Sequence, residues 1–378
     1  MPWSLSEMKG NLWQENCVAH YDDEVLTFFH QYFGNNARTC LHIGGAGFDP
    51  RSADIVQCLS KILKERLVVC LIKEERPNPD PKLIFRANAN LQNIRENCNN
   101  LEVEKIDIFS SDDNAVTGGR NAISSISKID FSKYTDVVID MSALSMGVSY
   151  PIVSFFYKNA KTIKPGPNVH LALISNPELD SLINSIPNDR YSEVHGFALH
   201  DLMGDAEKAR LWLPFLSENK EHVLEMIHAG IAPHDTCPIL PFPSEDPQKG
   251  DRIAFGVLSS IQANLGGPLE NEWGLDLKDF VYADERKPLD IYRTILRIDD
   301  ERKPVFETFG GSTIILSPLG SKMPTIGALM AAMERQFPVV YVEALGYNVD
   351  WCKIDKLNRS ESRMAHIWLW GDAYMTEE

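Results

Sequence analysis

Glycine, acidic and basic residues gather where an apolar run ends at Ile43. The segment that follows is Gly-Gly-Ala-Gly-Phe-Asp-Pro-Arg, residues 44–51. Glycines let a backbone turn tightly and bring its N–H groups close to a ligand, and an arginine fork matches a phosphate or carboxylate. The spacing differs from the GxGxxG dinucleotide fingerprint, because Pro50 stands at the third glycine position. The alternative is a tight turn with a surface arginine. The predicted ligand-binding residues of this loop are Gly44, Gly45, Gly47, Asp49 and Arg51.

Two further apolar runs end in polar residues. The run 67–72 leads to Glu74, and an acid at the end of the second strand often binds ribose hydroxyls in Rossmann-type sites. The run 135–139 leads to Asp140, followed by Ser142 and Ser145, whose hydroxyls can donate hydrogen bonds to an anion. The alternatives are a solvated charged face around Glu74 and ordinary helix capping by the Asp or Ser residues.

The C-terminal part of the chain contains two more candidate segments. Asp284, Glu285 and Arg286 follow a short apolar run, and mixed charges suit sugar and phosphate recognition. A stronger candidate is the segment 314–333, in which an apolar run enters a Ser/Gly/Lys loop and then an alanine-rich helix. The start of a helix favours anions, although close helix–sheet packing is the alternative reason for such small residues. The predicted ligand-binding residues of this second segment are Ser317, Gly320, Ser321 and Lys322.

The elements that must position these residues alternate along the chain. Continuous apolar runs at 39–43, 67–72, 103–108, 135–140 and 169–175 are separated by segments with helical spacing, and a second set starts near residue 237. Such alternation predicts parallel sheets covered on both faces. We therefore expect an α/β protein with two Rossmann-like lobes and mostly parallel sheets.

The predicted organisation divides the 378 residues into two lobes and a connection. Residues 1–175 form an N-terminal lobe that begins with a helical segment, and 176–236 form a bridging segment. Residues 237–378 form a C-terminal lobe with an aromatic tail. In open parallel sheets ligands bind beyond the carboxyl ends of the strands, which is where the candidate loops fall. We expect Lys322 to lie in the same cleft as Asp140, or in one continuous with it.

Composition excludes several classes of protein. The net charge of −16 repels nucleic-acid backbones, so non-specific nucleic-acid binding is not expected. No apolar run approaches the roughly 20 residues of a membrane span, and the N-terminus does not resemble a signal peptide, which predicts a cytoplasmic protein. The seven cysteines form no CxxC pair, and no metal site is predicted.

The segment 314–333 resembles the ligand-facing strand–loop–helix of CARF-type nucleotide sensors, which have a Gly-Thr-Lys-like loop followed by a helix of small residues. The resemblance covers about thirty residues. It implies a nucleotide or another phosphorylated small molecule as the anionic ligand. It also implies a sensor or regulatory protein of bacterial defence against phage.

The same residues support two other interpretations. A nucleotide-dependent transferase or glycosidase could use Asp140, Glu285 and Lys322 as catalytic groups, and the loop 44–49 loosely resembles that of a class I methyltransferase core. A scaffold whose aromatic tail docks a protein partner, or a second copy of the chain, is the third interpretation. No catalytic constellation in the sequence decides between them.

Overall fold

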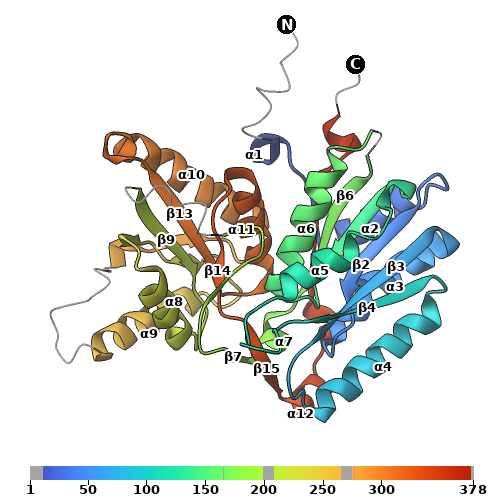
Figure 1. Cartoon of the computed structure of the whole chain (residues 1–378), viewed down its shortest axis with the longest axis horizontal. Coiled ribbons are helices and arrows are strands. Elements are labelled where there is room, and N and C mark those ends of the chain that lie inside the picture. Colours follow the sequence, from blue (N-terminus) through green and yellow to red (C-terminus); the bar gives the residue numbers. More distant parts are fainter. Residues whose placement is uncertain (1–11, 165, 199–207, 265–274, 276, 376–378) are drawn as a thin grey trace, which may run out of the picture. The chain divides into compact units, whose positions relative to one another are not determined.

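The computed structural model of the protein describes residues 12–164, 166–198, 208–264, 275 and 277–375. The chain divides into two compact units, unit 1 with residues 1–186 and 345–378 and unit 2 with residues 187–344 (Figure 1). Each unit contains a sheet of mostly or wholly parallel strands with helices packed on it, so the predicted α/β fold is confirmed. Residues 1–11 of the predicted N-terminal helical segment lie outside the described residues.

Within the described residues, the sheet of unit 1 has the strand order β1-β16-β6-β5-β2-β3-β4. Its strands are β1 (Val18–Tyr21), β2 (Cys40–Gly45), β3 (Leu67–Glu75), β4 (Leu101–Asp107), β5 (Asp136–Asp140), β6 (Asn168–Ser175) and β16 (Arg363–Trp370). Strands β2 to β6 pair in parallel, whereas β16 is antiparallel to both of its neighbours. The chain runs outward from β2 through β3 and β4 and then returns to β5. The strand order therefore reverses between β2 and β5.

Apolar strands and amphipathic helices build the core of unit 1. Helices α2 (Asp23–Phe33), α3 (Asp54–Leu63) and α4 (Pro81–Asn97) contribute to one cluster of buried side chains with β2 and β3. Helices α5 (Gly118–Ile126) and α6 (Met146–Ala160) pack against each other and follow β4 and β5. In α3, Ile55, Val56 and Leu59 recur at helical spacing and are fully buried, so this helix covers the sheet directly after the glycine loop.

The sheet of unit 2 is parallel throughout its described pairs. Strand β9 (Ala209–Phe215) pairs on one side with β13 (Ser312–Pro318). On its other side it pairs with the short strands β10 (Asp235–Thr236) and β11 (Ile239–Pro241), and β12 (Val281–Ala283) pairs with β11. Helices α8 (Glu221–Ile231) and α9 (Lys249–Asn264) share a core cluster with Trp212 and Ile315. Helices α10 (Pro288–Phe306) and α11 (Lys322–Arg335) pack against each other and against β13.

Short elements connect and extend the two units. Strand β15 pairs with β7, and β14 pairs antiparallel with β8. The short elements are α1 (Leu12–Asn16), α7 (Pro177–Ser181), β7 (Ile183–Pro187), β8 (Ser192–Glu193), β14 (Val340–Tyr341), β15 (Ala344–Val349) and α12 (Trp351–Ile354).

The division of the chain differs from the expected one in two places. The segment 176–236, expected to bridge the lobes, contributes β9, to which both β13 and β11 of the second sheet pair. Strand β9 contains Pro214, although a proline cannot donate to a strand ladder. The aromatic tail belongs to unit 1, where β16 lies between β6 and β1.

Candidate functional site

The carboxyl edge of unit 1 brings the loops after β2 and β5 into close contact. A Cβ atom added to Gly45 would lie 2.8 Å from the carbonyl oxygen of Ala143, and one added to Gly44 would lie 2.7 Å from Cε1 of His42. Both glycines are therefore required by the packing of the protein itself. Gly47 differs, because a Cβ atom added there would have the Ala143 carbonyl oxygen as its nearest neighbour, 3.8 Å away.

The guanidinium group of Arg51 is buried and lies between two carboxylates of unit 1. Its Nε and Nη2 donate to the two carboxylate oxygens of Asp49 at 2.9 and 2.6 Å, and Nη1 lies 2.8 Å from Oδ1 of Asp180. Burial by itself would lower the pKa of Arg51, but the two carboxylates raise it above its usual value. Arg51, predicted as a ligand-binding residue, is thus buried and paired with carboxylates of the protein itself. Arg51 and Asp49 hold the loop in place.

Glu74 is also engaged by its surroundings. One carboxylate oxygen accepts from the backbone N–H of Ser145 at 2.8 Å, and the other lies 2.9 Å from Nη2 of Arg76. Ser145 is the N-cap residue of α6, so Glu74 places a negative charge at the start of that helix, where the helix dipole favours it. This contact ties the loop after β5 to the end of β3, across the end of β2.

Asp140 lies beneath this loop, at the end of β5. Its Oδ1 accepts from the N–H of Ser142 at 2.8 Å, and the hydroxyl of Ser142 accepts from the N–H of Ile174. Oδ2 of Asp140 lies 3.7 Å from Nε2 of His42, a fully buried residue that the sequence analysis did not single out. Neither ring nitrogen of His42 makes a hydrogen bond to another described residue.

Aromatic and charged side chains from the C-terminal segment cover this edge of unit 1. The ring of Phe48 lies 5.2 Å from that of Tyr347 and 6.1 Å from that of Trp351. The guanidinium carbon of Arg76 lies 5.3 Å from the centre of the Tyr347 ring, and Arg359 pairs with Asp54 at the start of α3. Burial raises the pKa of Asp54 to about 6 despite Arg359, and the nearby carboxylates of Asp140 and Asp49 add to the rise. Most charged side chains of this edge are thus paired with one another.

The carboxyl edge of unit 2 contains a small pocket that is partly open to solvent. The pocket lies where strands β9, β11 and β12 end and where α9 and α11 begin, and α10 contributes Ile291. Its lining residues are Phe215, Leu216, Ser217, Ile239, Leu240, Pro241, Lys249, Ala283, Glu285, Ile291, Gly320, Ser321 and Pro324.

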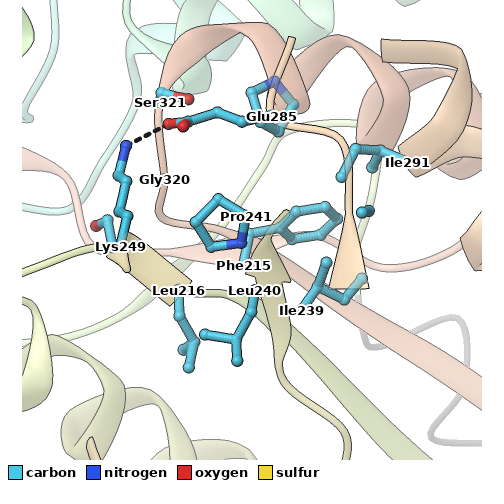
Figure 2. Close-up of a pocket in the computed structure, with 13 residues that line it drawn as sticks. Phe215, Leu216, Ile239, Leu240, Pro241, Lys249, Glu285, Ile291, Gly320 and Ser321 are labelled. Atoms are coloured by element: carbon cyan, nitrogen blue, oxygen red, sulfur yellow. Dashed lines mark hydrogen bonds and ion pairs between the residues drawn. The ribbon is translucent and has the colours of Figure 1, made fainter. Parts of the chain in front are cut away.

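Polar groups line one side of this pocket and apolar groups the other. Figure 2 shows Lys249, Glu285 and Ser321 on one side, with Leu216, Leu240 and Ile239 opposite them. Nζ of Lys249 donates to Oε1 of Glu285 at 2.5 Å. Ser321 is the N-cap residue of α11, and its side chain makes no capping bond within the described part of the chain. The pocket therefore combines apolar walls, one cation, one carboxylate and a helix start without a side-chain cap.

The structure places the other predicted residues of unit 2 around this pocket or in the core. Ser317 is fully buried, and its hydroxyl accepts from Nε1 of Trp212 at 2.9 Å, so it is a core residue. Asp284 is buried and accepts from the N–H of Arg286 at 2.9 Å, and neither of these residues lines the pocket. Lys322 is the first residue of α11 but does not line the pocket either. Asp140 belongs to unit 1 and Lys322 to unit 2, so their shared cleft stays a prediction.

A row of histidines crosses the sheet of unit 1 and was not predicted. Nδ1 of His20 lies 3.0 Å from Nδ1 of His366, whose Nε2 lies 3.0 Å from Nδ1 of His170. Nε2 of His170 lies 3.1 Å from Oδ1 of Asp136, which also accepts from the hydroxyl of Tyr32. These side chains come from four strands and one helix, which is why residue spacing did not reveal them.

Two searches of the described residues bear on cofactors and membranes. No cluster of three or more histidine, cysteine or acidic side chains there has the arrangement of a metal site. None of the helices formed by those residues is both long and apolar enough to cross a bilayer.

Comparison with known proteins adds little beyond the fold. No protein-family model and no curated protein matches the chain. Among solved structures, the chain is similar to the glycopeptide N-methyltransferase MtfA complexed with sinefungin, with 14% sequence identity and a TM-score of 0.20. The match covers 46% of this chain and 61% of that one.

Proposed function

We propose that this protein is a nucleotide-binding sensor or regulatory protein whose ligand lies in the pocket of unit 2. The observation that carries the proposal is the contrast between the two sheet edges. At the edge of unit 1, Arg51 and Glu74 are already paired with protein groups. At the edge of unit 2, the predicted residues Gly320, Ser321 and Glu285 line an open pocket.

The chemistry of the pocket suits a ligand with an anionic end and an apolar part. Binding pockets for small molecules are mainly apolar, with a few polar groups that fix orientation. The lining of this pocket has that character. A phosphate near the start of α11 would meet a favourable helix dipole and backbone donors, with Lys249, which is paired with Glu285, as a nearby cation.

The sensor interpretation is favoured over the enzyme interpretation by the distribution of reactive groups. Of the three proposed catalytic residues, Asp140 is buried under its own loop in unit 1, and Lys322 does not line the pocket. Glu285 remains in the pocket, but it is paired with Lys249. The similarity of residues 314–333 to CARF-type sensors supports the same proposal, and it is the basis for proposing a role in bacterial anti-phage defence.

Native mass spectrometry of the purified protein tests the proposal directly. We expect a retained small molecule that leaves unmodified when the protein is denatured. Incubation with a panel of nucleotides should give binding without turnover. Recovery of a cleaved or transferred product would instead support the alternative of a nucleotide-dependent transferase or glycosidase.

A matched pair of glycine variants tests which unit holds the ligand. A Cβ atom added to Gly320 would have the Leu216 oxygen as its nearest neighbour at 3.7 Å, and one added to Gly47 would have the Ala143 oxygen at 3.8 Å. Both positions therefore have room for a side chain. We expect Gly320→Val to remove nucleotide binding, measured by calorimetry, and Gly47→Val to preserve it. The opposite result would move the site to unit 1.

A further inference from the structure

Two aromatic side chains lie exposed beside the pocket of unit 2. Phe242 is 53% exposed and Tyr282 is 49% exposed, although large aromatic rings are usually buried. Their ring centres are 6.0 Å apart, and the ring planes make an angle of 78°. The two rings therefore form one small aromatic surface with an edge-to-face arrangement.

Strand pairing fixes this aromatic surface next to the pocket. Phe242 directly follows the lining residue Pro241, and Tyr282 directly precedes the lining residue Ala283. Pro241 pairs with Ala283 in the register of β11 and β12, and the N–H of Phe242 donates to the Ala283 oxygen at 2.8 Å. Leu240 pairs with Tyr282, so these two side chains lie on the same face of the sheet. Phe242 directly follows the end of β11, and its ring contacts that of Tyr282.

We propose that Phe242 and Tyr282 form a stacking surface for the base of a nucleotide whose phosphate lies in the adjacent pocket. This inference rests on the proposed function and names the part of the ligand that the pocket does not hold. The pocket is small and partly open, so it accommodates one end of a nucleotide and leaves the other end at the surface. A flat base at that surface meets the face of one ring and the edge of the other.

Stacking also predicts the selectivity of the site. Every base has a π-face, so stacking on an aromatic side chain tolerates different bases, and its loss weakens binding by about tenfold or more. A surface of two rings is small compared with a protein interface, which buries about 800 Å² on each partner. The position of the rings beside a pocket with a cation and a helix start favours a nucleotide over a protein segment.

The experiment compares probes with and without a base. Calorimetry measures the affinity of the full chain for ribose 5-phosphate and for the adenosine, guanosine, cytidine and uridine 5′-monophosphates. The variants are Tyr282→Leu and Phe242→Leu, which keep apolar bulk but lack a ring, and Tyr282→Phe, which keeps the ring. Circular dichroism and the melting temperature without ligand check that each variant folds.

We expect the wild type to bind at least one nucleotide about tenfold or more tightly than ribose 5-phosphate. Each leucine variant should lose most of that difference while binding ribose 5-phosphate unchanged, and Tyr282→Phe should retain it. Leucine variants that bind nucleotides as the wild type does would overturn the inference and leave the proposed function standing. A wild type that binds neither probe would overturn both. A dimer that the leucine variants dissociate would show that the rings form a subunit contact, and would also overturn the inference.

Discussion

Replacing Arg51 with methionine should destabilise unit 1 without directly affecting the ligand site. Methionine keeps most of the apolar stem of Arg51 and removes the charge. The change leaves Asp49 and Asp180 without their cation, and their side chains are only 11% and 25% exposed. The stability of the region around β2 should therefore fall, because two partly buried carboxylates lose their partner.

The magnitude follows from the burial of the group. Removing one partner of a buried ion pair costs about 3–5 kcal/mol. Arg51 is 1% exposed and engages both carboxylates, but Asp180 can recover some hydration. We therefore expect a loss of about 3 kcal/mol, at the lower end of that range. Adding Asp49→Asn to Arg51→Met should restore part of the loss, because the double variant leaves one buried charge fewer.

Hydrogen exchange followed by mass spectrometry resolves the two units separately. A single unfolding free energy is not well defined for a protein with two compact units, so peptides from β2 and β3 report on unit 1 and peptides from β9 and β13 serve as the internal control. We expect faster exchange in the peptides from β2 and β3, unchanged exchange in those from β9 and β13, and unchanged nucleotide affinity. The reasoning is refuted if Arg51→Met changes exchange by less than about 1 kcal/mol and lowers the affinity instead, since that result would make Arg51 a ligand group.

Three further predictions concern pH, helix packing and cysteine reactivity. Burial, with smaller contributions from His170 and His20, lowers the pKa of His366 in the folded protein. When the pH falls, His366 is therefore protonated in the unfolded chain before it is protonated in the folded one. The stability of unit 1 should fall as the pH drops below about 6.5, and His366→Gln should flatten this slope in thermal melts between pH 5 and 8. Gly327→Ala should destabilise unit 2 by about 1–3 kcal/mol in urea unfolding, because the added Cβ would lie 2.2 Å from the Pro288 oxygen, whereas Gly320→Ala should be nearly neutral. A thiol reagent should label the exposed Cys352 in the folded protein and the buried Cys40 only after unfolding. Burial holds the pKa of the Cys40 thiol well above its usual value, so little reactive thiolate forms there. Peptide mapping distinguishes the two sites.

The sequence predicted strands most reliably where a continuous apolar run indicates a strand buried on both faces. The runs leading to β2, β3 and β5 are buried on both faces in a parallel sheet, so local composition was enough. Strand β16 was missed because its antiparallel neighbours are far away in sequence: His366 pairs with His20, more than 300 residues earlier. No local pattern carries information about such a partner.

The candidate residues likewise include some that local sequence predicted and one that it missed. Three of the predicted site residues, Gly320, Ser321 and Glu285, line one pocket, because strand ends and helix starts meet at one edge of a parallel sheet. Lys249, the cation of the pocket, was missed because it lies in a polar stretch without an apolar strand directly before it.

The sequence alone determined the α/β class and the loops that follow the apolar strands. It did so because apolar periodicity and glycine-containing loops are local properties of the chain. Only the tertiary structure decided which polar side chains are paired within the protein. Arg51 and Gly320 were both predicted as ligand-binding residues, but Asp180, more than 100 residues away, pairs with the arginine, whereas the glycine lines a pocket. The sequence does not reveal such long-range pairing, although a charge brought into the interior is stable there only with a partner.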